Sequence, residues 1–227
     1  MANAPSSPAE HDKSPEKSPD KPPGRHLRIT KPSPWVERFK HLIEPGARVL
    51  DLAAGGGRHG RMLLEAGAEV VFIDRDTQAL ADLAGTPAAT VIEADMETGV
   101  SPFGPGGPLA GESFDAVVVV NYLYRPLMAD LVRAIRPGGV LIYETFARGN
   151  EAYSRPRNPD HLLKSAELMD DITGRMQVVA YEHGIVHAAD VLGVKQRLCA
   201  VKDLDASTRD DGDPPAHPLD AETAKGV

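Results

Sequence analysis

The chain has 227 residues, of which 41% are hydrophobic, and a net charge of −8. This length is enough for one α/β domain with a full core, and the acidic balance argues against a nucleic-acid partner. A single cysteine, Cys199, excludes an internal disulfide and a zinc cluster, so we expect no bound metal. No apolar run approaches the about 20 residues of a membrane span, and no signal-peptide h-region is evident. We therefore expect a cytoplasmic protein that does not contact membranes.

The two ends of the chain differ in composition from the middle. Residues 1–32 and 203–227 are rich in proline and charged side chains and poor in large apolar ones. Such segments bury too little apolar surface to offset the entropy of ordering them. We predict two disordered tails around one folded domain, residues 33–202.

Helical and strand signals alternate along the predicted domain. Ser33 and Pro34 are typical of a helix N-cap and first turn, and apolar side chains follow at helical spacing from Trp35 to Ile43. Pro45-Gly46 ends this helix. The following pattern predicts strands at 48–52, 70–73, 90–93, 114–120 and 140–145, helices at 58–66, 78–84 (capped by Asp76) and around 127–135, and a Gly/Pro-rich loop at 96–113.

The order of these elements indicates the fold class. Strands that alternate with helices form a parallel sheet, and fully apolar strands imply that helices cover both faces. The last two predicted strands, 177–182 and 196–202, are joined by a linker that favours an antiparallel hairpin. We predict an α/β fold with a doubly wound, mostly parallel seven-stranded Rossmann-like sheet and an antiparallel C-terminal edge hairpin.

A glycine-rich loop, Gly55-Gly56-Gly57, directly follows the first predicted strand. In a doubly wound sheet this position lies at the crevice where ligands bind, and missing side chains let a ligand approach the backbone. Two ligands fit this pattern. Gly55 to Gly60 satisfies the dinucleotide fingerprint G-x-G-x-x-G, with Asp74 near the required offset. The alternative ligand is S-adenosylmethionine.

Asp51, at the end of the first strand, favours the second ligand. A carboxylate there would repel a pyrophosphate but could receive the ammonium of S-adenosylmethionine. It could also order or cap the loop by accepting its N–H groups, since aspartate often bonds to nearby backbone.

From Trp35 to Lys202 the chain resembles the class I S-adenosylmethionine-dependent methyltransferases. Their first motif, D/E-x-G-x-G-x-G, stands here as Asp51-Leu52-Ala53-Ala54-Gly55-Gly56-Gly57, with Ala53 in place of the first glycine. The stretches FDAVVVVNYLY and RAIRPGGVLIYET resemble the family's fourth-strand motif and the following helix-turn-strand. Within this family, the stretch GGGRHG resembles the sequence of small-molecule enzymes such as the tellurite-resistance methyltransferases.

This resemblance implies roles for further residues. Asp74 matches the acid that binds the ribose hydroxyls, and Asp95 with Met96 matches the residues beside the adenine amine. The implied cofactor site consists of Asp51, Ala53, Gly55, Gly57, Asp74, Arg75, Asp95, Met96 and Asn121.

The acceptor side carries no decisive motif. Asn121-Tyr122 lacks the two prolines found at this place in enzymes that methylate nucleic-acid bases. Arg155 and Arg157 could clamp an anionic substrate or could be ordinary solvated arginines. The candidates for catalysis are His59, Tyr122, Arg155 and Arg157, followed by Tyr153 and His161.

The predicted function is methyl transfer from S-adenosylmethionine to a small, possibly anionic acceptor, on oxygen, sulfur or a chalcogen. Two alternatives stay open: an NAD-dependent oxidoreductase, and a protein that binds S-adenosylmethionine without catalysis. The oligomeric state is not predicted.

Overall fold

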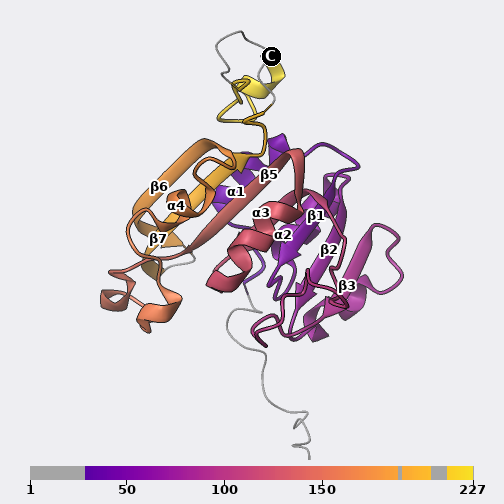
Figure 1. The fold of residues 1–227 in the computed structure, drawn as a ribbon, viewed down its shortest axis with the longest axis horizontal. Helices are drawn as coiled ribbons and strands as arrows, with labels where there is room; N and C mark the ends of the chain where they lie inside the picture. The colour runs from indigo at the N-terminus through magenta and orange to yellow at the C-terminus, as the bar shows by residue number, and fades with distance from the viewer. Residues whose placement is uncertain (1–28, 189–190, 206–213, 227) are drawn as a thin grey trace, which may run out of the picture.

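A computed structural model describes residues 29–188, 191–205 and 214–226. They form one seven-stranded sheet in the order β3-β2-β1-β4-β5-β7-β6 (Figure 1). The strands are β1 (Arg48–Leu52), β2 (Glu69–Asp74), β3 (Ala89–Glu93), β4 (Phe114–Val120), β5 (Ile135–Phe146), β6 (Gln177–Ala188) and β7 (Val191–Val201).

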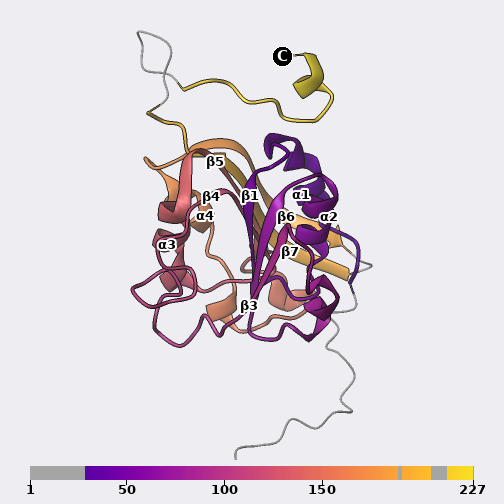
Figure 2. The same ribbon diagram turned by 90° about the vertical axis from the view of Figure 1, so that its right-hand side faces the viewer.

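Helices cover both faces of the sheet. Figure 2 shows α1 and α2 on one face and α3 and α4 on the other. The α-helices are α1 (Pro34–Phe39), α2 (Arg58–Glu65), α3 (Met128–Ala134) and α4 (Glu167–Ile172). Short 3₁₀-helices are η2 (Lys40–Leu42), η3 (Gln78–Leu83), η4 (Arg125–Leu127), η5 (Asn150–Ala152), η6 (Pro159–His161) and η7 (Thr223–Gly226).

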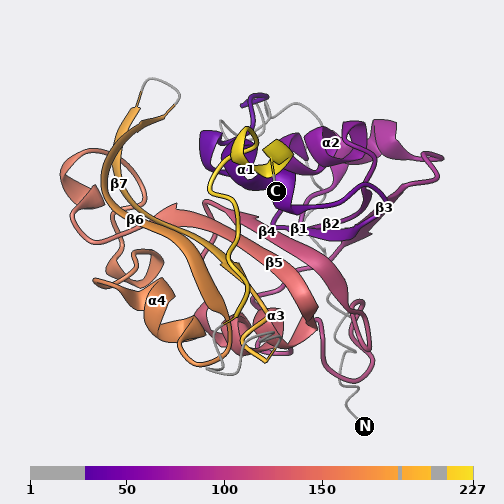
Figure 3. The same ribbon diagram turned by 90° about the horizontal axis from the view of Figure 1, so that it is seen from above.

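The predicted sheet is confirmed. The first five strands pair in parallel, and β7 pairs antiparallel with both β5 and β6. The hairpin is longer than predicted because β6 and β7 continue to pair up to Ala188 and Val191, whereas β5 leaves β7 at Lys195. Its end therefore projects beyond the rest of the sheet (Figure 3). Gly184 breaks the run of strand-forming residues in the sequence, but β6 continues through Gly184 because it pairs with β7 there.

The packing of strand β4 explains why the strands are unbroken apolar runs in the sequence. Val117 and Val119 belong to the core under α3 and α4, while Val118 and Val120 belong to the core under α1 and α2. Because both faces are covered, both sets of side chains are apolar and buried. The sheet therefore separates two cores.

Two predicted helices differ in detail from the structure. Ser33 caps α1 as expected, accepting the Trp35 N–H at 3.2 Å, but the α-helix ends at Phe39 and a 3₁₀ turn follows. The helix predicted at 78–84 is the 3₁₀-helix η3. Asp76 accepts the Gln78 N–H at 3.2 Å in a local turn and does not cap an α-helix. Such side-chain bonds compete with α-helix formation.

Part of the predicted C-terminal tail makes specific contacts. The carbonyl of Leu219 accepts from Arg38 Nε at 3.4 Å, and His217 Nε2 lies 2.5 Å from Asp203 Oδ2. Figure 3 shows this segment passing over α1. Residues 203–205 and 214–226 are thus described with contacts to one another and to the domain, and the predicted tail boundary stays a prediction. Residues 1–28 and 206–213, also expected to be disordered, lie outside the described part of the chain.

Two kinds of feature are absent from the described residues. No helix among them is long and apolar enough to cross a bilayer. Within the same ranges, no three His, Cys, Asp or Glu side chains are grouped as a metal site.

Candidate functional site

The loop between β1 and α2 owes its shape to a left-handed backbone at every second residue. Ala53, Gly55 and Gly57 have φ of 54°, 56° and 73°. These are the three glycine positions of the motif noted above, so its spacing has a conformational cause. Ala53 keeps the left-handed conformation although its Cβ makes it costly. The substitution therefore leaves the loop geometry in place at some cost in stability.

Asp51 lies under this loop. Its side chain is 1% exposed, and its Oδ2 accepts the Gly60 N–H of α2 at 2.9 Å. Burial raises the pKa of Asp51 to about 7, against the opposing effects of the Gly60 bond and the Arg58 guanidinium. Of the roles considered for Asp51, the contact with backbone at the start of α2 is the one present in the structure.

Asp74, at the end of β2, holds the loop from the other side. Its Oδ2 accepts the Gly55 N–H at 2.8 Å, and its Oδ1 accepts the Asp76 N–H at 3.0 Å. Both carboxylate oxygens of Asp74 therefore bond to local backbone. Both carboxylate oxygens keep further acceptor capacity, since each has two lone pairs.

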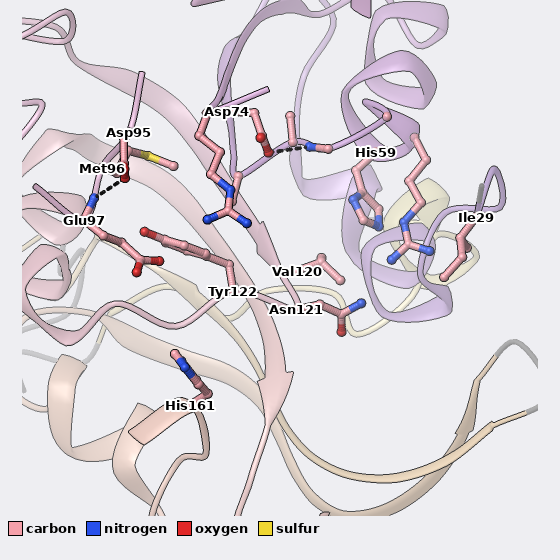
Figure 4. A pocket seen from close by; sticks show the side chains of 16 residues that line it. Ile29, His59, Asp74, Asp95, Met96, Glu97, Val120, Asn121, Tyr122 and His161 are labelled. Atoms are coloured by element: carbon pink, nitrogen blue, oxygen red, sulfur yellow. Dashed lines mark hydrogen bonds between the residues drawn. The ribbon is translucent and has the colours of Figure 1, made fainter. Parts of the chain in front are cut away.

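A cavity of about 540 Å³ opens at the carboxyl ends of β1, β2 and β4 (Figure 4). Seven of the expected cofactor-binding residues line it, whereas Asp51 and Gly57 do not. A Cβ on Gly57 would lie 2.6 Å from Leu80 Cδ2 and so would point into the core. The expected residues that line the cavity are Ala53, Gly55, Asp74, Arg75, Asp95, Met96 and Asn121; the others are Ile29, Ala54, Gly56, Arg58, His59, Glu97, Val120, Tyr122 and His161.

Two charged lining residues were not predicted. Arg58, the first residue of α2, donates from Nη1 to the Lys31 carbonyl at 3.1 Å and so ties the segment before α1 to the cavity. Glu97 lies two residues after Asp95 and donates its N–H to Asp95 Oδ1 at 2.9 Å. In the sequence, the only indication of a role was that Arg58 directly follows the glycine motif and that Glu97 lies two residues after Asp95.

A second cavity of about 250 Å³ adjoins the first. The two share Glu97, Asn121, Tyr122 and His161 as lining residues. Figure 4 shows Tyr122 and Asn121 in the middle of the site, with Asp74 and His59 on one side and His161 on the other. The rest of the second cavity is lined by Leu123, Thr145, Phe146 and Pro156.

The candidates His59 and Tyr122 line the first cavity with their polar atoms buried. His59 Nε2 and the Tyr122 hydroxyl have no hydrogen-bond partner among the described residues. Burial, with the nearby Arg58 guanidinium, lowers the pKa of His59 to about 3, so its ring is neutral at pH 7. Burial and the carboxylate of Glu97 raise the pKa of Tyr122 well above its usual range. Both groups are therefore uncharged hydrogen-bonding groups near neutral pH.

Asn121 is held by a buried ionic cluster. It adopts a left-handed conformation (φ 60°) at the end of β4, and its Oδ1 accepts from Lys195 Nζ at 2.8 Å. Lys195 also pairs with Glu144, whose Oε2 accepts from Ser33 at 2.8 Å and from Arg197 Nε at 3.0 Å. Glu144 is 1% exposed and Lys195 5%. Burial would raise the pKa of Glu144, but the ammonium of Lys195 and the guanidinium of Arg197 hold it below its usual value.

Arg155 and Arg157 are exposed and line neither cavity. Pro156, between them, lines the second cavity. Tyr153 is 42% exposed and likewise lies outside both cavities. The structure therefore does not bring the two arginines together with the other candidate residues.

Opposite effects are expected at two positions of the glycine loop. Ala53→Gly should raise the free energy of unfolding by about 1 kcal/mol because the left-handed backbone no longer carries a Cβ. Gly57→Ala should lower it by about 1–3 kcal/mol because its Cβ would lie close to Leu80 and Phe72. Urea unfolding measures both, with Gly184→Ala, whose Cβ meets nothing within 4 Å, as the control. If Ala53→Gly and Gly57→Ala changed the free energy of unfolding in the same direction and by the same amount, the left-handed loop conformation would be contradicted.

Comparisons with known proteins agree with this geometry. The family model described as a methyltransferase domain matches residues 49–139. The ubiquinone biosynthesis O-methyltransferase of Burkholderia thailandensis is 30% identical over 128 residues, which is 52% of this chain and 52% of that protein. The chain thus spans about half the length of the curated relatives it matches.

Solved structures share the fold at low sequence identity. TehB from Haemophilus influenzae superposes with a TM-score of 0.58 and 16% identity, over 71% of this chain and 59% of that one. A Burkholderia thailandensis 1,6-didemethyltoxoflavin-N1-methyltransferase, solved with bound 1,6-didemethyltoxoflavin and S-adenosylhomocysteine, superposes with a TM-score of 0.56 and 19% identity, over 79% of each chain. Residues 49–139 therefore match a methyltransferase domain in sequence, and the described chain shares the fold of solved methyltransferases.

Proposed function

We propose that S-adenosylmethionine occupies the larger cavity, with its ribose hydroxyls on Asp74 and its adenine beside Asp95 and Met96. The groups that line this cavity support the assignment. The backbone of Gly55 and Gly56, which lines the cavity, and the acceptor oxygens of Asp74 and Asp95 suit a nucleoside. Arg58 offers a cation for the carboxylate of the amino-acid part, and neutral His59 offers a further polar contact. The NAD-dependent alternative gains no support from the family match.

The methyl acceptor is proposed to be a small molecule in the second cavity. The observation that carries this proposal is the set of four residues shared by the two cavities, Glu97, Asn121, Tyr122 and His161. Ligands in adjoining cavities can place a nucleophile in line with the S–CH₃ bond. Such positioning can contribute about 7–11 kcal/mol to catalysis. A small-molecule acceptor also agrees with the toxoflavin enzyme of the same fold.

The charge of the second cavity favours an uncharged or cationic acceptor over the anionic one first considered. Among the described residues, its lining contains a carboxylate, Glu97, and no lysine or arginine. Phe146, Leu123 and Pro156 supply an apolar wall suited to an aromatic or aliphatic body. The curated relatives act on oxygen by name, and the toxoflavin enzyme on nitrogen. Oxygen is the acceptor atom we propose.

Calorimetric titration with S-adenosylhomocysteine, against NAD⁺, tests the cofactor assignment. The wild-type protein should bind the first and not the second. Asp74→Ala should weaken binding by about 1.5–3 kcal/mol, the range for hydrogen bonds to a charged group. Asp76→Ala is the matched control, since the Asp76 carboxylate accepts the Gln78 N–H of its local turn and Asp76 does not line the cavity, while alanine keeps the backbone N–H that Asp74 accepts. An unchanged dissociation constant in folded Asp74→Ala would refute the ribose assignment.

A further inference from the structure

We propose that His161 accepts the proton of a hydroxyl acceptor during methyl transfer, and that Arg125, paired with Glu167, positions it. This inference rests on the proposed function and deepens it, because it restricts the acceptor to compounds whose hydroxyl must lose a proton. It assigns a role to a histidine that the sequence left among the weakest candidates.

The position of His161 supports this role. It is the last residue of η6 and lines both cavities. In Figure 4 it faces the site from the side opposite Asp74 and His59, with Tyr122 and Asn121 between. A proton acceptor at the junction of the two cavities would meet the acceptor without occupying the cofactor's place. A general base must lie within hydrogen-bond reach of the proton that it removes.

Arg125 fixes the backbone on both sides of His161. Its Nη1 donates to the Asp160 carbonyl at 2.6 Å, and its Nη2 donates to the Leu162 carbonyl at 3.0 Å. Glu167 completes the arrangement by accepting from Arg125 Nε at 2.5 Å and Nη2 at 3.1 Å. Leu162 is fully buried and anchors the same segment in the core. The planar guanidinium thus uses its fixed donor geometry to hold one short loop.

The other titratable groups of the cavities are less suited to take a proton near pH 7. His59 has a pKa lowered to about 3 by its burial. Tyr122 has a pKa raised above its usual range and so keeps its own proton. Asp95 Oδ1 already accepts the Glu97 N–H at 2.9 Å, and histidine is the side chain that most often serves as a general base.

The proton step balances with methyl transfer. When S-adenosylmethionine is bound, the acceptor oxygen forms the new C–O bond with its lone pair while the C–S bond breaks and its electron pair stays on sulfur. The hydroxyl proton moves to a ring nitrogen of His161, which becomes a cation. It is later released to solvent, to which the exposed His161 has access. A thiol acceptor, already ionised in part, needs no such base.

Turnover with a labelled methyl donor tests the inference, with catechol and phenol as hydroxyl probes and benzenethiol as the thiol probe. We expect His161→Ala to lower kcat for the hydroxyl probes by about 10²–10⁴-fold and to leave benzenethiol methylation within threefold of wild type. Added imidazole should restore part of the lost rate, which a structural role for His161 would not allow. His183→Ala, an exposed histidine on β6 outside both cavities, is the matched control.

A binding readout separates this inference from the proposed function. With S-adenosylhomocysteine present, catechol should shift the imidazole NMR signal of His161. Arg125→Met should displace that signal and lower catechol turnover at least tenfold while S-adenosylhomocysteine affinity stays within twofold. Wild-type methylation of benzenethiol but of neither hydroxyl probe, or His161→Ala with unchanged catechol turnover, would overturn the role of His161. Binding of S-adenosylhomocysteine without turnover of any probe would overturn both this inference and the proposed methyl transfer.

Discussion

Glu144→Gln is expected to lower the free energy of unfolding by about 3–5 kcal/mol, the cost of breaking a buried ion pair by removing one partner. The carboxylate of Glu144 neutralises the ammonium of Lys195, which is 5% exposed, and the guanidinium of Arg197. Glutamine occupies the same space but leaves the buried ammonium of Lys195 without this counter-charge, while Arg197 keeps its pair with Glu182. Because Lys195 also holds Asn121, the variant should bind S-adenosylhomocysteine more weakly as well. Urea unfolding and calorimetry measure the two effects.

A second substitution tests the cause of this loss. Adding Lys195→Met to Glu144→Gln should recover part of the lost stability, since it removes the buried unpaired charge. The control is Glu182→Gln, which removes a carboxylate that pairs with Arg38 and Arg197 at the surface and should cost less than about 1 kcal/mol. If the double variant were less stable than Glu144→Gln by the full cost of Lys195→Met alone, the two side chains would not be energetically coupled.

Asp51→Asn should stabilise the protein without ligand, and increasingly so as pH rises. The pKa of Asp51 is about 7 when folded, against about 4 when unfolded. Between these values the unfolded chain has released a proton that the folded protein retains, so the contribution of Asp51 to stability is greatest below pH 4 and is lost as pH rises to 7. Asparagine has no such dependence. Its advantage over the wild type should grow by roughly 2–3 kcal/mol between pH 5 and pH 8.

Unfolding in urea at several pH values measures this difference. Asp82→Asn is a matched control, because Asp82 pairs with Arg61 at the surface and its pKa is lowered by that hydrogen bond. Asp82→Asn should lower the free energy of unfolding, and this loss should not turn into a gain between pH 5 and pH 8. A difference between Asp51→Asn and wild type that does not change with pH would show that Asp51 is ionised in the folded protein throughout.

The sheet was predictable from the sequence because its signals are local. β1 and β4 are short apolar runs, and their predicted bounds are those of the structure. The glycine motif was predictable for the same reason, since every second residue needs a left-handed backbone. Features that join distant segments were not predictable. Ser33 bonds to Glu144 across 111 residues of sequence, and no local pattern marks that contact.

The site was predicted in part. Residues at the ends of parallel strands, such as Asp74 and Asp95, line the cavity because strand ends converge at one edge of the sheet. Arg155 and Arg157 follow the fifth strand too, but the loop that carries them turns their side chains to solvent. The position of His161 depends on Arg125, which lies more than thirty residues earlier in the chain. Sequence spacing could not reveal that bond.

The most direct test of the central claim is a crystal structure of the protein with S-adenosylhomocysteine and catechol. The account predicts the ribose within hydrogen-bond distance of Asp74, the adenine beside Asp95 and Met96, and the sulfur directed at the junction formed by Asn121, Tyr122 and His161. Catechol should lie in the second cavity, with a hydroxyl near His161. S-adenosylhomocysteine bound away from the glycine loop, or with its sulfur directed away from the second cavity, would contradict the account.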